Sequence, residues 1–299
     1  MKNIIESQQF SLDFINKIFS IADRIGKNKK APLKGKIMAS LFYEPSTRTR
    51  FSFESAMLRL GGSVITTENA KEFSSAIKGE TLEDSTRVIN NYADVIVMRH
   101  YESGASKRAS LVSDIPVINA GDGAGQHPTQ ALLDLYTIKK ELGKIDGIHI
   151  AMVGDLKNGR TIRSLSYLLG KYKNVKIYFV SPKGLKVGDD IKEYLNKHKV
   201  NYEEIEDLES VINKIDVLYQ TRIQKERFKN EKEYLRFKGC YKIDMKIVNK
   251  MKSKSIIMHP LPRVDEISTE VDSSKKAIYF KQTKYGLLIR MALLFYLLK

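Results

Sequence analysis

The feature that most constrains the fold of this chain is a regular alternation of short apolar runs with segments of helical periodicity. The run "KIMASLFY" at residues 36–43 has the length and composition of a buried strand. After it, apolar residues recur at the helical spacing i, i+3, i+4 and i+7, namely Phe53, Ala56, Met57 and Leu60. Further strands are expected at residues 94–98, 115–120, 147–155, 175–181, 216–221 and 255–260. Strands that alternate with helices are typical of parallel sheets built from βαβ units, so the sequence predicts an α/β fold.

The same alternation indicates two domains. It restarts near residue 147, after a helix expected at 129–143 that ends at a glycine. A chain of 299 residues is long enough for two domains of ordinary size. We therefore expect one α/β domain at residues 1–140 and a second at residues 141–284, each with a parallel sheet flanked by helices.

The most apolar stretch lies near the C-terminus and reads "YGLLIRMALLFYLLK". It contains Arg290 and is shorter than the roughly 20 apolar residues that a membrane span needs. We expect a buried helix at residues 285–299 and no membrane partner.

The charge balance is strongly basic, with a formal net charge of +16 and a pI of about 9.6. Most of the excess is lysine spread along the chain and interleaved with acidic residues, as in "KERFKNEKEYLRFK" at residues 225–238. There is no RNP-like motif, zinc-finger pattern or basic helical stripe in the sequence, which disfavours nucleic acid as the partner. Small anionic substrates fit a positive field equally well.

Cysteine use points to the compartment. Cys240 is the only cysteine, so the chain has neither a disulfide framework nor a cysteine-based zinc pattern. The first residues, "MKNIIESQQFSL", lack the pattern of a signal or transit peptide. The sequence therefore predicts a reducing, cytoplasmic setting.

The segment "EPSTRTR" at residues 44–50 follows the first expected strand and opens the next helix. A helix N-terminus offers free backbone N–H groups and the positive end of the helix dipole, which together bind anions. Ser46 and Thr47 can donate hydroxyl hydrogen bonds, and the planar fork of Arg48 fits phosphate oxygens. The plainer alternative is capping by Ser46 with solvated arginines. Capping needs one hydroxyl, however, and this turn has three hydroxyls and two arginines within five residues.

A second polar cluster, "NAGDGAGQHPTQALLDL" at residues 119–135, again joins a strand to a helix. Its glycines allow close approach of the backbone to a ligand. His127 and Gln130 are three residues apart at the helix start and share a face. His127 could donate to a carbonyl oxygen and Gln130 could bind an amine, but a structural histidine before proline is an equally good interpretation from this segment alone.

A third cluster, "MVGDLKNGRTIRSL" at residues 152–165, nearly matches the P-loop pattern, with Arg160 in the place of the lysine. Arginine is not a conservative replacement for lysine at a phosphate, which weakens a nucleotide-binding hypothesis. Arg160 at a helix start can still pair with a carboxylate.

Three more polar segments complete the inventory: "YQTRIQKER" at 219–227, "MHPLPRVDE" at 258–266 and "EFSSAIKGETLEDS" at 72–85. The candidate groups are cations, hydroxyls and amides, and neither a catalytic carboxylate pair nor a set of metal ligands stands out. Such a site binds a substrate with several negative charges and stabilises charge without supplying a nucleophile.

Together these segments closely resemble the aspartate branch of the aspartate/ornithine carbamoyltransferase family, along nearly the whole chain and in the same order. "STRTR" and "HPTQ" are general to carbamoyltransferases. The combination of "KGETLEDS", "VMRH", "NAGDGAGQHPTQ", "MVGDLKNGRT", "TRIQKER" and "HPLPRVDEI" is specific to the aspartate branch. Ornithine enzymes typically have a cysteine in an HCLP segment, which here reads "HPLP" at residues 259–262. The resemblance thus disfavours ornithine as the substrate.

The resemblance implies roles for individual residues. Those expected to bind carbamoyl phosphate are Ser46, Thr47, Arg48, Thr49, Arg99, His127, Gln130, Leu261 and Pro262. Those expected to act in catalysis are Thr49, Arg99, His127, Arg48 and Lys78. Thr49, Arg99 and His127 would stabilise the oxyanion as the amine of aspartate attacks. Gln130 would hold the carbamoyl nitrogen together with the backbone carbonyls of Leu261 and Pro262.

The acceptor side is implied in the same way. Arg160 and Arg222 would clamp the two carboxylates of L-aspartate, with Gln224 and Lys78 assisting. Ser74 and Lys78 match a loop that reaches the active site of a neighbouring subunit, which implies a homotrimer with shared sites and leaves regulatory chains possible. Arg50 is expected to be a structural pairing residue.

The family mechanism is direct acyl transfer without cofactor or metal, at the first committed step of pyrimidine synthesis. The resemblance assigns carbamoyl phosphate binding to the domain at 1–140, to which the terminal helix at 285–299 returns, and aspartate binding to the domain at 141–284. Three alternatives stay open from the sequence: another amine acceptor, a P-loop-like nucleotide site at residues 154–161, and a basic nucleic-acid-binding module.

Overall fold

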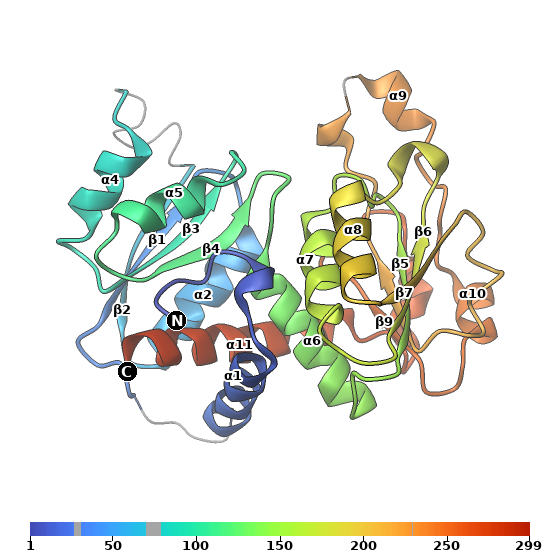
Figure 1. Ribbon diagram of the computed structural model, residues 1–299, viewed down its shortest axis with the longest axis horizontal. Helices are drawn as coiled ribbons and strands as arrows, with labels where there is room; N and C mark the ends of the chain where they lie inside the picture. Colours follow the sequence, from blue (N-terminus) through green and yellow to red (C-terminus); the bar gives the residue numbers. More distant parts are fainter. Residues whose placement is uncertain (27–30, 70–78, 229) are drawn as a thin grey trace. The chain divides into compact units, whose positions relative to one another are not determined.

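The computed structural model of the chain describes residues 1–26, 31–69, 79–228 and 230–299 (Figure 1). The fold is α/β, and the chain forms two compact units. Unit 1 consists of Met1–Leu133 together with Lys284–Lys299, and unit 2 consists of Asp134–Thr283. Each unit contains one parallel sheet flanked by helices, as the sequence predicts.

Unit 1 has a four-stranded sheet in the order β2-β1-β3-β4, with every pair parallel. The strands are β1 (Ile37–Phe42), β2 (Ser63–Glu68), β3 (Val95–His100) and β4 (Val117–Asp122). The helices of this part of the chain are α1 (Leu12–Ile25), α2 (Thr47–Arg59), α4 (Leu82–Ile89), α5 (Ala105–Val112) and α6 (Pro128–Leu142), the last of which continues into unit 2. The strands β3 and β4 are buried along their whole length, as expected for a sheet covered on both faces.

The C-terminal helix α11 (Tyr279–Leu298) returns to unit 1. Its Tyr296 ring packs edge-on against Phe14 of α1, with the ring centroids 5.3 Å apart. The Arg290 guanidinium lies over the Phe53 ring of α2 at 5.2 Å from the centroid. The expectation that this helix packs on the first domain is confirmed, and the helix starts six residues earlier than predicted. In the described part of the chain, none of the helices is long and apolar enough to cross a membrane.

Unit 2 has a five-stranded sheet in the order β7-β6-β5-β8-β9, again wholly parallel. The strands are β5 (His149–Val153), β6 (Lys176–Val180), β7 (Asn201–Ile205), β8 (Val217–Gln220) and β9 (Ile256–Met258). The helices are α7 (Arg160–Leu169), α8 (Asp189–Lys197), α9 (Glu231–Leu235) and α10 (Met245–Lys250), with the short 3₁₀ helices η3 (Lys183–Leu185), η4 (Lys225–Arg227) and η5 (Thr269–Ser273) between them.

Every strand expected from the sequence is present, and two further strands were not expected. β2 lies at one edge of the first sheet and β7 at one edge of the second. Both are largely solvated and polar, with the sequences SVITTE and NYEEI. An edge strand is covered on fewer sides than a central one, so it needs no continuous apolar run and leaves little periodic signal in the sequence.

Candidate active site

In each unit the polar clusters of the sequence lie at the carboxyl ends of neighbouring strands. In unit 1, β1 leads into α2, β3 ends with Arg99 and His100, and β4 leads into α6. Because β1, β3 and β4 are adjacent in a parallel sheet, these three ends lie side by side at one sheet edge. Open α/β sheets bind ligands at this end of the sheet, beyond the carboxyl ends of the strands.

At the start of α2, the Ser46 hydroxyl does not cap the helix. Ser46 is the N-cap residue, but among the described contacts its side chain makes no capping hydrogen bond. The first turn of α2 contains no acidic residue that would satisfy the helix dipole. Simple capping by Ser46, the plainer of the two interpretations, therefore does not describe this turn. The turn keeps the features of an anion-binding helix N-terminus.

Arg99 joins the three strand ends of unit 1. Its Nη2 donates to Thr49 Oγ1 of α2 at 3.0 Å and contacts His127 Nε2 at 3.2 Å. Its Nε donates to the Ala120 carbonyl in β4 at 2.9 Å. Arg99, Thr49 and His127 are all buried. The structure therefore brings together three residues that the sequence-based assignment placed on the carbamoyl carbonyl.

The contact with Arg99 also defines the state of His127. A guanidinium nitrogen can only donate, so Nε2 of His127 accepts and the imidazole is neutral, with its proton on Nδ1. Nδ1 faces the Thr129 hydroxyl at 3.4 Å. Gln130 follows one helical turn later and is also buried, with its backbone N–H donating to the His127 carbonyl at 3.0 Å.

Hydrogen bonds and close packing within the protein determine the conformation of the glycine-rich loop before His127. The Asp122 carboxylate accepts hydrogen bonds from the backbone N–H groups of Gly104, at 2.8 Å, and Gln126, at 2.7 Å. Gly123 has a φ of +48°, and a Cβ there would lie 2.6 Å from the Tyr101 carbonyl oxygen. This glycine is required for close packing of the loop, whereas the sequence suggested close approach of a ligand.

Arg50 turns away from the cluster and pairs with carboxylates. It forms ion pairs with Glu68 of β2 and, at 3.4 Å, with Glu54 of α2. This agrees with its expected role as a structural pairing residue.

In unit 2, the turn before α7 resembles a P-loop in sequence but not in its hydrogen bonding. The backbone N–H groups of Leu156 and Lys157 both donate to the Leu185 carbonyl, and that of Asn158 donates to Asp155 Oδ1 at 3.0 Å. A P-loop directs such groups at phosphates. Because they are used internally here, the structure disfavours the nucleotide-site alternative and leaves Arg160, the first residue of α7, as the ligand candidate.

Asp155 is a buried residue of this candidate site that the sequence did not single out. Its side chain is fully buried at the end of β5. Burial raises the pKa of this carboxyl group, and hydrogen bonds from Asn158 and from the backbone N–H of Gln224 act in the opposite direction. The carboxylate therefore ties the turn that leads to Arg160 to the loop that carries Gln224. A lone aspartate at the carboxyl end of an expected strand was the only sequence signal for this role.

The Arg222 loop is fixed to β5 directly before the arginine. The backbone N–H and the hydroxyl of Thr221 both donate to the Val153 carbonyl, at 2.8 and 2.9 Å. Gly154 has a φ of +116°, and a Cβ there would lie 2.4 Å from the Thr221 carbonyl oxygen, so only glycine fits. The loops that carry Arg160 and Arg222 thus follow two hydrogen-bonded strands, β5 and β8.

A cavity of about 230 Å³ lies beside Arg222 within unit 2. The charged or hydroxyl-bearing residues that line it are Thr221, Arg222, Lys225, Tyr234, Lys238, Tyr241, Asp265 and Glu266. Three cations and the two carboxylates of Asp265 and Glu266 share this lining, and Lys225 also pairs with Glu231, so the charges around the cavity are nearly balanced.

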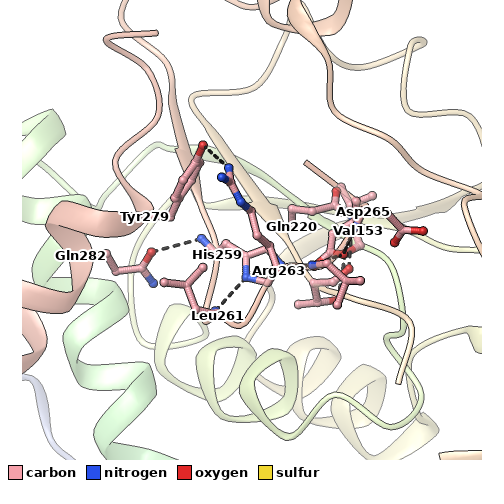
Figure 2. A network of polar contacts seen from close by, with 11 residues as sticks. Val153, Gln220, His259, Leu261, Arg263, Asp265, Tyr279 and Gln282 are labelled. Carbon is pink, nitrogen blue, oxygen red and sulfur yellow. Dashed lines mark hydrogen bonds and ion pairs between the residues drawn. The ribbon is translucent and has the colours of Figure 1, made fainter. Parts of the chain in front are cut away.

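The segment after β9 forms a polar network (Figure 2). His259 Nε2 lies 2.7 Å from Glu266 Oε1, and the backbone N–H of Leu261 donates to His259 Nδ1 at 2.7 Å. The Leu261–Pro262 peptide is cis. These two residues are the ones whose carbonyl groups were expected to bind the carbamoyl nitrogen.

Not every expected site residue can be placed. Ser74 and Lys78 lie outside the described residues. The remaining candidates divide between the units. Unit 1 contains Ser46, Thr47, Arg48, Thr49, Arg99, His127 and Gln130, and unit 2 contains Arg160, Arg222, Gln224, Leu261 and Pro262. Among the described residues, His, Cys, Asp and Glu side chains form no group that could hold a metal ion.

Comparisons with known proteins match both units. Residues 2–140 match the model of the aspartate/ornithine carbamoyltransferase carbamoyl-P binding domain. Residues 146–297 match the model of the Asp/Orn binding domain of the same family. The chain belongs to the aspartate/ornithine carbamoyltransferase family.

Similar proteins within the family are named as aspartate carbamoyltransferases. The chain is 58% identical to aspartate carbamoyltransferase 2, chloroplastic, of Pisum sativum over 300 residues, which cover 98% of this chain and 78% of the relative. The catalytic subunit of aspartate transcarbamoylase from M. jannaschii is 52% identical, with a TM-score of 0.91 and coverage of 99% of this chain and 98% of that chain.

A third comparison concerns a structure solved with ligands. The aspartate transcarbamoylase of Trypanosoma cruzi, in complex with carbamoyl phosphate and aspartate, is 43% identical to this chain. Its TM-score is 0.93, and the match covers 98% of this chain and 96% of that chain. The carbamoyltransferase fold expected from the sequence motifs is thereby confirmed for both units.

Proposed function

We propose that this chain is an aspartate carbamoyltransferase catalytic chain and that its active-site residues are those brought together at the two sheet edges. The enzyme transfers the carbamoyl group of carbamoyl phosphate to the amine of L-aspartate, giving N-carbamoyl-L-aspartate and phosphate for pyrimidine biosynthesis. The observation that carries the site assignment is the buried Arg99–Thr49–His127 cluster beside the N-terminus of α2. This cluster offers preorganised donors next to an anion-binding helix end.

Carbamoyl phosphate binds on unit 1 in this proposal. Its phosphate takes the backbone N–H groups at the start of α2, with Ser46, Thr47 and Arg48 as side-chain donors. Its carbonyl oxygen accepts hydrogen bonds from the Arg99 N–H that contacts His127 and from the hydroxyl of Thr49. Once Arg99 donates to the substrate, a shift of the imidazole proton to Nε2 lets His127 donate to the same oxygen. Gln130 and the backbone carbonyls of Leu261 and Pro262 hold the carbamoyl nitrogen.

L-Aspartate binds on unit 2, where Arg160 and Arg222 pair with its two carboxylates and Gln224 assists. Its amine nitrogen attacks the carbamoyl carbon, and the developing oxyanion is stabilised by Thr49, Arg99 and His127. The carbon–oxygen bond to phosphate then breaks. Phosphate leaves with the electron pair of that bond and takes up a proton from the amine.

The assembly we propose is a homotrimer in which Ser74 and Lys78 act in the site of a neighbouring subunit. One supporting feature is an apolar face on α2 and β2. Phe51, Leu58 and Ile65 are 54%, 60% and 42% exposed, although large apolar side chains favour burial. A shallow groove lies along α2 between Phe51 and Arg59. In the sequence, the segment with Ser74 and Lys78 comes soon after β2.

Location and further partners stay predictions. The sequence predicts a cytoplasmic protein, and regulatory chains remain possible. The Pisum sativum relative is named as chloroplastic.

The site assignment is tested by replacing Arg48 or His127 with alanine. Each change removes a group from the proposed phosphate or oxyanion site and is expected to lower kcat by about 10²–10³-fold without unfolding the chain, since a lost oxyanion donor typically costs this much. The measurement is steady-state formation of carbamoyl aspartate, with circular dichroism to check the fold.

The matched control for this test is Arg24→Ala, which removes an exposed arginine from the last turn of α1. Its kcat should equal that of the unmodified chain. Near-normal turnover in both the Arg48 and the His127 variants would refute the assignment.

A further inference from the structure

His259 is held on three sides by groups of unit 2. Its backbone N–H donates to Gln282 Oε1 at 3.1 Å. Its Nδ1 accepts from the Leu261 backbone N–H at 2.7 Å, and its Nε2 lies 2.7 Å from Glu266 Oε1. Figure 2 shows His259 joined by dashed lines to Gln282 and to Leu261. The side chain is 2% exposed, so its contacts are set by the protein and not by solvent.

These contacts fix one tautomer of the imidazole. A backbone N–H can only donate, so Nδ1 of His259 carries a lone pair and the proton is on Nε2, which donates to Glu266. The other carboxylate oxygen of Glu266 accepts from the backbone N–H groups of Val264 and Asp265, at 3.0 and 3.1 Å. Burial raises the pKa of Glu266, but the hydrogen bonds from His259 and the backbone outweigh it, so the pKa is lowered overall and the group stays ionised.

The hydrogen bond from the Leu261 N–H to His259 is distinctive because the residues on both sides of Leu261 are prolines. Pro260 and Pro262 have no backbone N–H, so Leu261 supplies the only backbone donor of these three residues. Leu261 also has a φ of +54°, in a region that leucine rarely adopts. Such a conformation persists only where the surroundings hold it. The lone pair on His259 Nδ1 is the partner that holds this peptide.

A second layer anchors the backbone of His259. Gln282 of α11, whose Oε1 accepts the His259 N–H, donates through Nε2 to Asp134 Oδ1 of α6 at 2.6 Å. Asp134 Oδ2 accepts from the Tyr219 hydroxyl of β8 at 2.7 Å. All of these side chains are buried, and their hydrogen bonds link two helices and the central part of the sheet to the segment after β9. A histidine fixed in this way can define the position of the peptide that it holds.

We propose that His259 is a positioning residue of the carbamoyl transfer: Glu266 fixes its Nε2–H tautomer, and the Nδ1 lone pair holds the backbone N–H of Leu261, the residue whose carbonyl, in the next peptide group, holds the carbamoyl nitrogen. The inference rests on the proposed function, because Leu261 matters only if its carbonyl meets the substrate. His259 itself touches no reacting atom in this account. It acts through the geometry of Leu261, for which a misplacement of about 1 Å can cost on the order of 10²-fold in rate.

Two substitutions separate the functions of the two ring nitrogens. His259→Asn keeps an acceptor near the position of Nδ1 but does not reach Glu266. His259→Gln keeps a donor near the position of Nε2 but has no acceptor for the Leu261 N–H. If holding Leu261 is the role of His259, the Gln variant should lose about 10²-fold in kcat and the Asn variant tenfold or less. The KM for L-aspartate should change little in either, because Arg160 and Arg222 are untouched.

The control is His198→Gln, which changes an exposed histidine on the C-terminal end of α8 and should leave kcat unchanged. Melting temperatures are measured for all variants. Equal losses in the Asn and Gln variants that follow their melting temperatures would indicate a purely structural role and overturn the proposal. Unchanged kcat in the Gln variant would also overturn it.

A second measurement does not depend on turnover. Nitrogen NMR of the histidine side chains in the unmodified chain should show His259 protonated on Nε2 and unprotonated on Nδ1. A proton on Nδ1 would contradict the proposal even if the variants failed to fold. If the unmodified chain forms no carbamoyl aspartate, the proposed function fails, whereas the NMR result still decides whether the imidazole holds Leu261.

Discussion

At the residue scale, Arg99 shows how contacts that are distant in sequence create the site. It is separated from Thr49 by 50 residues and from His127 by 28, yet its guanidinium contacts both. Each of these residues was singled out from its own motif or from the family resemblance. Their mutual contact, and the tautomer of His127 that follows from it, come from the parallel order of β1, β3 and β4 and cannot be read from any local pattern.

Other residues gave too weak a local signal to be assigned in advance. Asp155 and Glu266 are carboxylates inside segments that were judged by their arginines, glycines and prolines. Their roles depend on which backbone N–H groups the fold brings to them, Gln224 for one and Val264 and Asp265 for the other. The sequence singles out the groups that are proposed to touch substrate, whereas the residues that hold those groups in place emerge only from the fold.

Asp155 leads to a prediction about the acceptor side. In Asp155→Asn, an amide NH₂ group replaces one of the two accepting carboxylate oxygens. This group then faces an N–H donor of Asn158 or Gln224, with which it cannot form a hydrogen bond. The two loops should then separate, and kcat/KM for L-aspartate should fall by about tenfold or more, as expected for lost positioning of the reactants. Steady-state kinetics with L-aspartate as the varied substrate measure this.

The affinity for carbamoyl phosphate serves as the internal control for that variant. Asp155 is not among the residues proposed to bind carbamoyl phosphate, so the dissociation constant for carbamoyl phosphate measured by calorimetry should be unchanged. A normal kcat/KM for L-aspartate would show that Asp155 does not hold the clamp.

His100 leads to a prediction about pH. It is buried next to Tyr43 and Tyr101 and accepts a hydrogen bond from the Glu102 N–H through Nδ1 at 3.0 Å. Burial lowers the pKa of His100 below its ordinary value of 6.5. The unfolded chain therefore binds a proton at higher pH than the folded chain. The stability that His100 contributes is present above pH 6.5 and is lost as the pH falls from 6.5 through the lowered pKa.

The test is urea unfolding at a series of pH values for the unmodified chain and for His100→Asn, which keeps an acceptor for the Glu102 N–H. The decline in unfolding free energy below pH 6.5 should be shallower in the variant. Identical slopes in the two proteins would mean that His100 does not contribute to the pH dependence.

At the element scale, buried strands are predicted better than partly exposed ones: β4 and β9 are edge strands too, but they are buried and were expected. The expected strands at 36–43 and 175–181 contain β1 and β6, and the one at 94–98 overlaps β3, which extends two residues further; all three strands are central and largely buried. β2 and β7 are edge strands held by backbone pairing to one neighbour, and neither has a continuous apolar run, although β2 is rich in β-branched residues. Strand order is likewise a property of crossovers and packing that the apolar pattern does not encode.

Helix α11 leads to a prediction about stability. Its Leu293 is fully buried in unit 1, where the helix packs near Phe14 and Phe53. Leu293→Ala should lower the stability of unit 1 by about 2–5 kcal/mol, from lost burial and the cavity left behind. Urea denaturation followed by circular dichroism measures the loss.

Leu111→Ala is the matched control, since this leucine on α5 is 78% exposed. It should change the unfolding free energy by no more than about 0.5 kcal/mol. Equal effects of the two substitutions would contradict the packing of α11 on unit 1.

At the scale of the whole molecule, the proposed homotrimer can be tested by subunit mixing. A Lys78→Ala chain and a His127→Ala chain should each be nearly inactive. Dissociated, mixed in equal amounts and reassembled, they should recover about a quarter of the unmodified activity, because one site in four then combines an intact His127 with an intact Lys78 from its neighbour.

Activity that stays at the level of the separate variants after verified subunit exchange would show that each site is built from one chain. The control is a mixture of two preparations of the Lys78→Ala chain treated in the same way, which should recover nothing.

The account as a whole depends on the identity of the acceptor. The most direct measurement is product formation by the purified chain with carbamoyl phosphate, with L-aspartate and L-ornithine offered in parallel. The account predicts carbamoyl aspartate and no citrulline, since Arg160 and Arg222 provide a clamp for two carboxylates. Citrulline in place of carbamoyl aspartate would contradict the assignment of unit 2, and no product from either acceptor would contradict the proposed reaction.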